Sequence, residues 1–295
     1  MFYIKTFLEY LKLERNYSER TVDSYRLDLE LFVSFLRQTE STLTWNTVDK
    51  DLVRRWVMDM MDKGNTPRSV NRRLSALRSF YRFLLIRGVV QNNPAKSVVG
   101  PKKGKDLPYF LKESEMDRLL DEVKFEDSFW GMRDRLMICL FYSTGVRLSE
   151  LIGLNVEDVD LSQGQLKVTG KRNKQRIIPF GAELAEMLQA YLVARQTAFE
   201  GQVDEALILS TRGVRMTPDG VRRLVKIYLS QVTTLKKKTP HVLRHTFATA
   251  LLNHDADLEV VKELLGHDSL AATQIYTHTT FEEMKKVYKQ AHPRA

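Results

Sequence analysis

The sequence has little cysteine and no long apolar run. Cys139 is the only cysteine among 295 residues, so no disulfide can form within the chain, and a reducing cytoplasm is the expected compartment. No uninterrupted apolar stretch approaches the ~20 residues that a membrane-spanning helix needs. Near the start, Lys5, Glu9 and Lys12 interrupt the apolar residues of segment 2–13, which excludes a signal peptide. The sequence therefore predicts a cytoplasmic protein without a membrane span.

Acidic residues are missing from one long stretch. The whole chain holds 46 Lys and Arg against 37 Asp and Glu, a net charge of +9, which favours a polyanionic partner. Between Gly64 and Lys105 there is no acidic residue, whereas ten basic residues occur: Arg68, Arg72, Arg73, Arg78, Arg82, Arg87, Lys96, Lys102, Lys103 and Lys105. Solvated helix faces usually mix both signs, so we interpret this stretch as a surface that contacts DNA phosphates. The DNA-contact candidates here are Arg68, Arg72, Arg73, Arg78, Lys102 and Lys103. A face that only confers solubility is the alternative.

Apolar residues at helical spacing predict a four-helix bundle at residues 1–98. Its expected helices span about 4–11, 18–36, 48–63 and 66–87. Thr66 and Pro67 suit the cap and the first position of the last helix. Residues 99–108 are rich in Gly, Pro and Lys and lack apolar periodicity, which is typical of a linker. The sequence thus predicts a helical DNA-binding domain at 1–98, a linker at 99–108 and a second domain at 109–295.

The second domain is predicted to be mostly helical with a small β-hairpin. Expected elements are helices at about 113–123, 133–142, 182–199, 217–231, 257–265 and 281–289, and a short strand at 207–209. Apolar residues alternate on both sides of the turn 170–176, which predicts a hairpin with a cationic tip able to reach a DNA groove. Further DNA-contact candidates are therefore Arg172, Lys174 and Arg176 at this tip, and Arg222 and Arg223 on the helix 217–231.

Residues suited to phosphate chemistry occur together near the end of the chain: His241, Arg244, His267 and Tyr276. His241 and Arg244 are three residues apart and share one helix face. His267 follows Gly266, which suits the residue after a helix, and Tyr276 comes about two helical turns after Ser269, a candidate cap. His245 points off the face of His241 and Arg244, and we interpret it as structural. Earlier in the chain, Arg147 follows a short STG turn, where its guanidinium is well placed to hold a phosphate in a bidentate manner.

Six residues carry a resemblance to a known family: Arg147, Lys171, His241, Arg244, His267 and Tyr276. In the motifs TGVRLSEL, GKRNKQR, HVLRHTFAT, LLGH and IYTH, the chain resembles the tyrosine recombinases, also called phage-type integrases. Within that family it is similar to the Xer group, which resolves chromosome dimers at cell division. The resemblance implies a mainly α protein, with an N-terminal SAM-like helical bundle and a mixed α/β catalytic domain that contains a small antiparallel sheet. Arg172, Gln175 and Ala271 depart from the usual Xer pattern, and the six residues above do not.

The resemblance also implies a mechanism without a metal or another cofactor. Tyr276 attacks a DNA phosphate and forms a 3′-phosphotyrosyl bond. Arg147 and Arg244 hold the non-bridging oxygens, and Lys171 protonates the leaving 5′-oxygen. His241 or His267 is the base. The implied partners are double-stranded DNA, a homo- or hetero-tetramer on paired sites that includes a related recombinase, and, as a further candidate, a DNA translocase.

Three alternatives stay open from the sequence. A non-catalytic DNA-binding protein needs the basic helices and the hairpin but not Tyr276. A metal-dependent nuclease is silenced by EDTA, whereas a tyrosine recombinase keeps its cleavage activity. A mobile-element integrase uses the same chemistry, although the absence of an arm-binding domain ahead of Phe2 favours the Xer type.

Overall fold

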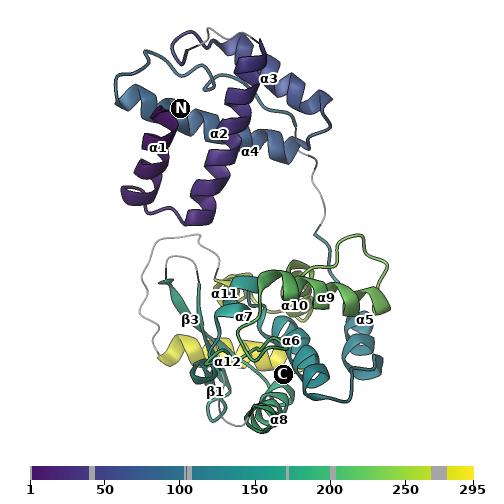
Figure 1. The fold of residues 1–295 in the computed structure, drawn as a ribbon. Coiled ribbons are helices and arrows are strands. Elements are labelled where there is room, and N and C mark those ends of the chain that lie inside the picture. Colours follow the sequence, from purple (N-terminus) through teal and green to yellow (C-terminus); the bar gives the residue numbers. More distant parts are fainter. Residues whose placement is uncertain are drawn as a thin grey trace. The chain divides into compact units, whose positions relative to one another are not determined.

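The computed structural model describes residues 2–39, 44–102, 104, 108–170, 173–199, 204–266 and 278–295. The chain divides into two compact units, Met1–Asp106 and Leu107–Ala295 (Figure 1). Each unit has a hydrophobic core of its own. The boundary between the units falls inside the segment 99–108, which the sequence assigns to a linker.

The first unit is a small helical bundle, as the apolar spacing predicts. Its helices are α1 (Phe2–Leu13), α2 (Glu19–Thr39), α3 (Lys50–Asp62) and α4 (Pro67–Ile86). The Thr66 side chain caps α4 by accepting from the backbone N–H of Ser69 at 3.3 Å, and Pro67 takes the first helical position. α4 packs against the other three helices, and its apolar face, including Leu74 and Phe80, is fully buried.

The second unit is mixed α/β with a three-stranded antiparallel sheet. Its helices are α5 (Glu113–Asp117), the π-helix η1 (Arg118–Glu122), α6 (Phe129–Thr144), α7 (Leu148–Gly153), the 3-10 helix η2 (Val156–Asp158), α8 (Ala182–Ala198), α9 (Pro218–Val232), α10 (Pro240–Asn253), α11 (Leu258–Leu265) and α12 (His278–Ala291). The strands β1 (Val159–Asp160), β2 (Gln165–Thr169) and β3 (Gln175–Pro179) lie in the order β1-β2-β3. The predicted fold class is confirmed.

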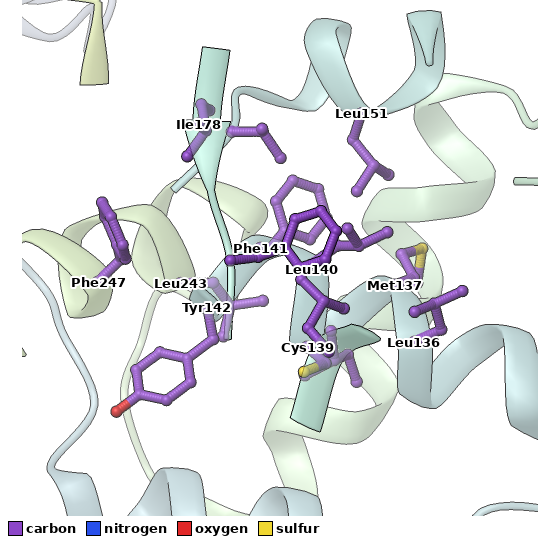
Figure 2. Close-up of a cluster of buried hydrophobic side chains, with 14 of the residues drawn as sticks. Leu136, Met137, Cys139, Leu140, Phe141, Tyr142, Leu151, Ile178, Leu243 and Phe247 are labelled. Atoms are coloured by element: carbon purple, nitrogen blue, oxygen red, sulfur yellow. The ribbon is translucent and has the colours of Figure 1, made fainter. Parts of the chain in front are cut away.

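Helix α6 carries many of the buried side chains in the hydrophobic cluster that Figure 2 shows. It is buried along almost its entire length and packs against α8 and α10, which explains why residues 136–142 are apolar on every side of the helix. α6 ends at Gly145, which has a φ of +59°, a conformation that favours glycine. A Cβ at Gly145 would lie 2.3 Å from Cδ1 of Phe247 on α10. This close approach brings the residues after α6 next to α10.

The hairpin β2–β3 confirms the predicted alternation. Lys167 pairs with Ile177 and Val168 with Arg176, and the backbone N–H of Gly170 donates to the carbonyl of Lys174 at 2.7 Å to close the turn. Side chains two residues apart on a strand share one face. Arg176 and Ile178 are accordingly both buried, so the exposed tip is shorter than the sequence predicts.

Three local expectations differ from the structure. The predicted helix 113–123 continues from α5 into η1, a π-helix. The predicted strand 207–209 is wrong: its residues are buried, but the segment forms only isolated bridges, between Asn155 and Ala206 and between Leu209 and Arg215. On α11, Leu258 belongs to the predicted apolar stripe but is 52% exposed, because it is the first residue of the helix and lies at the edge of the core.

Candidate active site

Arg147 lies at the start of α7, immediately after the turn that ends α6. Its Nη1 donates to Oε1 of Glu150 and its Nη2 to the carbonyl of Gly266, each at 2.7 Å. Its backbone N–H donates to Oε2 of Glu150 at 2.8 Å. The side chain is 35% exposed, so the guanidinium is held in place and still reaches solvent.

Arg244, on α10, is only 5% exposed. Its guanidinium donates to the carbonyls of Gly145 and Leu265. Burial, and then the charge of the nearby Arg147, lowers the pKa of Arg244 to about 9. The group therefore stays a cation at neutral pH, and a bound phosphate would compensate its desolvation.

Glu150 and Arg176 complete the cluster, and the sequence did not identify this pair. The two guanidinium Nη atoms of Arg176 donate to the two carboxylate oxygens of Glu150, both at 2.9 Å. Burial raises the pKa of Glu150, but the hydrogen bonds and charges of Arg176 and Arg147 outweigh burial and hold it at about 2. Three arginines and one carboxylate leave a cluster with two excess positive charges, which suits an anionic ligand.

The last carbonyls of α11 each accept from a different arginine. Arg176 Nε donates to Leu264 at 2.8 Å, Arg244 to Leu265 and Arg147 to Gly266. A helix C-terminus has unpaired carbonyls and the negative end of the helix dipole, so cations stabilise it. The cluster thus joins α7, α10, β3 and the end of α11.

The remaining catalytic candidates are placed only in part. His241 is exposed on α10, three residues before Arg244. His245, which we interpreted as structural, is also exposed, and its ring centroid lies 5.6 Å from that of His241. Three further catalytic candidates, Lys171, His267 and Tyr276, lie outside the described residues. The structure does describe Gly170 and Gly266, which directly precede Lys171 and His267 in the sequence.

The DNA-contact candidates of the first unit differ in environment. Arg68 and Lys102 are exposed, and Arg72 is half exposed but pairs with the buried Asp28. Arg73 is mostly buried and donates to Oδ1 of Asn65 at 2.7 Å. Arg78 donates to the carbonyls of Ala95 and Val98, at 3.0 and 2.6 Å. Arg73 and Arg78 therefore hold parts of their own unit together, and Lys103 lies outside the described residues.

The DNA-contact candidates of the second unit require one correction. Arg176 was predicted to contact DNA from the hairpin tip, but it is 6% exposed and bound to Glu150, because the alternation of β3 points it inward. Lys174 and Arg223 are exposed, and Arg222 pairs with Asp219 on α9. Arg172 lies outside the described residues.

Two absences hold for the part of the chain that the structure describes. No helix there is long and apolar enough to cross a membrane. Nor does any group of three or more His, Cys, Asp or Glu side chains lie close enough together to bind a metal ion.

Comparisons with known proteins identify the family of this chain. Residues 109–283 match the phage integrase family, and residues 4–88 match the N-terminal SAM-like domain of phage integrases. The chain therefore belongs to the phage integrase family. Its similar relatives are tyrosine recombinases of the Xer type. XerC of Chlorobaculum tepidum is 42% identical over 98% of this chain and 94% of its own length. XerD of Oceanobacillus iheyensis is 35% identical over 99% of this chain and 98% of its own length.

Solved structures support the fold. The XerH recombinase bound to a palindromic difH substrate has a TM-score of 0.74 at 22% identity, over 92% of this chain and 80% of that one. A lambda integrase dimer bound to a COC′ core site has a TM-score of 0.69 at 19% identity, over 92% and 98% of the two chains. At these identities the structures show that the architecture is shared.

Proposed function

We propose that the protein is an Xer-type site-specific tyrosine recombinase that cuts and rejoins DNA through a 3′-phosphotyrosyl intermediate. The observation that carries this proposal is the convergence of Arg147 and Arg244 on the last carbonyls of α11, directly before the segment that contains His267 and Tyr276. The similarity to XerC along nearly the full chain supports the same conclusion.

The two arginines are suited to bind the phosphate that is attacked. A guanidinium has five N–H groups. Arg147 and Arg244 each donate two side-chain hydrogen bonds to partners within the described residues. The remaining donors of each are then available for non-bridging oxygens. Because the contacts to the protein already fix both groups, little reorganisation is needed as negative charge builds up on the pentavalent phosphorus.

Proton transfer falls to the other candidates. A tyrosine hydroxyl has a pKa near 10, so only about one in a thousand is ionised at neutral pH, and a base is needed. His241 or His267 takes this proton as the Tyr276 oxygen bonds to phosphorus. Lys171 gives a proton to the 5′-oxygen as its bond to phosphorus breaks. Rejoining reverses these steps, so the phosphotyrosyl bond conserves the bond energy and no nucleotide cofactor is consumed.

The similarity to XerC and XerD supports a proposal for the biological role. We propose that the helical domain at residues 1–98 and the catalytic domain at 109–295 both bind double-stranded DNA and that the exposed Arg68, Lys102 and Lys174 contact phosphates. The active assembly is a tetramer on paired sites, built from this chain with or without a related recombinase. It works in the cytoplasm, where it resolves chromosome dimers at cell division.

A nicked substrate tests the chemistry. A nick close to the cleavage site releases a short fragment on cleavage and prevents rejoining, so the covalent protein–DNA adduct accumulates. The wild-type protein should form an adduct whose DNA-bearing peptide contains Tyr276, and Tyr276→Phe should bind the same DNA and form none. An adduct at another residue would overturn the assignment.

A further inference from the structure

Arg176 connects three segments of the catalytic unit through one guanidinium. It lies on β3 and its bidentate contact with Glu150, at 2.9 Å for both oxygens, reaches α7. Its Nε donates to the carbonyl of Leu264 at 2.8 Å, which reaches the end of α11. The side chain is 6% exposed. Each of the three nitrogens of this side chain therefore donates to a protein partner.

The two glycines that precede Lys171 and His267 in the sequence both lie against this arginine or its partner. A Cβ at Gly266 would lie 3.1 to 3.3 Å from Nη1, Cδ and Cζ of Arg176. A Cβ at Gly170 would lie 3.1 Å from Oε1 of Glu150 and 3.9 Å from Nη1 of Arg176. The backbone on either side of the Glu150–Arg176 pair thus packs directly on it.

We propose that Arg176 is a positioning residue of the strand-transfer reaction. It holds Glu150, which in turn holds Arg147, and it fixes the backbone that leads into Lys171 and into His267. The inference rests on the proposed function, which assigns the chemistry to those residues. In this proposal Arg176 does not touch the substrate. It sets the relative placement of the catalytic side chains that do.

The geometry requires an arginine. A planar guanidinium donates in parallel to both carboxylate oxygens and still directs Nε to a carbonyl, whereas a lysine ammonium is a single point of charge. Arg176→Lys keeps the positive charge beside Glu150 and loses the two parallel hydrogen bonds to its carboxylate. A misplacement on the order of 1 Å costs about 100-fold in rate, so we expect cleavage to slow by about that factor while DNA affinity stays within about twofold of wild type.

The test compares two nicked substrates. One carries the natural bridging oxygen and the other a 5′-bridging phosphorothiolate, whose thiolate leaves without a general acid. General-acid catalysis contributes about 100-fold or more to the rate. If Arg176 places the hairpin that carries Lys171, the ratio of wild-type to Arg176→Lys cleavage rates should therefore be at least about tenfold smaller on the sulfur substrate than on the oxygen substrate. Equal losses on both substrates would overturn the inference.

Arg133→Lys is the matched control. Arg133 is 4% exposed, binds the carboxylate of Asp134 and donates to the carbonyl of Leu209 at 3.0 Å, so it loses the same kinds of bonds in the same unit. Both variants should lower the melting temperature. Only Arg176→Lys should lose less cleavage rate on the sulfur substrate than on the oxygen substrate. A similar difference between the substrates in Arg133→Lys would overturn the inference.

A glycine pair probes the same contact without changing any charge. Gly170→Ala pushes a methyl group against Glu150 and should reproduce the substrate-dependent loss on a smaller scale. Gly153→Ala, at the end of α7, has no atom within 4 Å of its added Cβ and should react like wild type. If Gly170→Ala loses rate equally on both substrates, the pair does not position the hairpin.

Tyr276→Phe separates this inference from the proposed function. Adducts that persist in Tyr276→Phe would contradict the nucleophile and, with it, the placement of catalytic groups by Arg176. Adducts that are lost in Tyr276→Phe, together with equal losses of Arg176→Lys on both substrates, would contradict the role of Arg176 alone.

Discussion

Replacing Glu150 with glutamine tests how far the arginine cluster depends on one buried carboxylate. The pKa of this carboxyl group is lowered from 4.5 to about 2 in the folded protein: burial raises it, and the hydrogen bonds and charges of Arg176 and Arg147 lower it by more. A difference of about 2.5 pKa units corresponds to about 3 kcal/mol in favour of the ionised folded form. Glu150 is 2% exposed, so solvent screens little of this energy.

Glutamine keeps the shape of the side chain but not its chemistry. It removes the negative charge and turns one acceptor oxygen into an NH2 group that faces guanidinium donors. We expect Glu150→Gln to reduce the free energy of unfolding at pH 7 by about 3 kcal/mol, which is about 9 °C in melting temperature for a unit of this size.

The pH dependence gives the sign of the effect. Because the folded pKa is lower than the unfolded value, ionised Glu150 stabilises the fold above about pH 4.5. This contribution is lost as the pH falls through about 2. The difference in unfolding free energy between wild type and Glu150→Gln should therefore shrink by about half between pH 7 and pH 3.

Urea unfolding at the two pH values measures both quantities. Glu186→Gln, at an exposed position on α8, is the control and should differ from wild type by less than about 0.5 kcal/mol. A difference below about 1 kcal/mol at pH 7 for Glu150→Gln, or one that does not change with pH, would refute the reasoning.

Three further predictions address proton transfer, pH stability and DNA contact. Lys171→Ala should cleave the oxygen substrate about 100-fold more slowly and recover on a 5′-phosphorothiolate; no recovery would remove Lys171 as the general acid. Burial lowers the pKa of His292 to about 4, so its neutral form stabilises the fold above about pH 6.5 and this contribution is lost towards pH 4. Calorimetry or urea unfolding should show that wild type loses about 2 kcal/mol more than His292→Gln between pH 7.5 and 5, and equal losses would contradict this. Arg68→Ala should weaken DNA binding and reduce the slope of log K against log salt by about 1, whereas Arg78→Ala should lower stability; the same salt slope as wild type in Arg68→Ala would exclude that phosphate contact.

Local patterns predicted most of the fold. The cap Thr66 with Pro67, the helix end at Gly266 and the alternation on the hairpin depend on residues adjacent in sequence, and the structure has each of them. The segment 207–209 shows the limit of such patterns. A short apolar run is typical of a buried strand, but strand formation requires a partner edge, and the structure provides only single bridges.

The sequence predicts the residue types of the candidate site but not which of its charged side chains pair with one another. Arg176 was assigned to the turn because charged residues cluster there. Ile178 lies two residues after Arg176 on β3 and points inward. Because side chains two residues apart on a strand share one face, the same alternation places Arg176 inward too. The spacing of three residues between Arg147, directly before α7, and Glu150 in its first turn is a visible signal for an ion pair. The contact between Arg176 and Glu150 joins positions 26 residues apart and follows only from the folded arrangement. The roles of Lys171, His267 and Tyr276 stay predictions.

The most direct test of the account is to trap covalent protein–DNA adducts from cells under denaturing conditions and to sequence the attached DNA ends, in wild type and in Tyr276→Phe. The account predicts adducts at one chromosomal locus in wild type and none in the variant. Adducts scattered over many loci or placed at the ends of mobile elements would contradict the role in dimer resolution, and adducts that persist in Tyr276→Phe would contradict the mechanism.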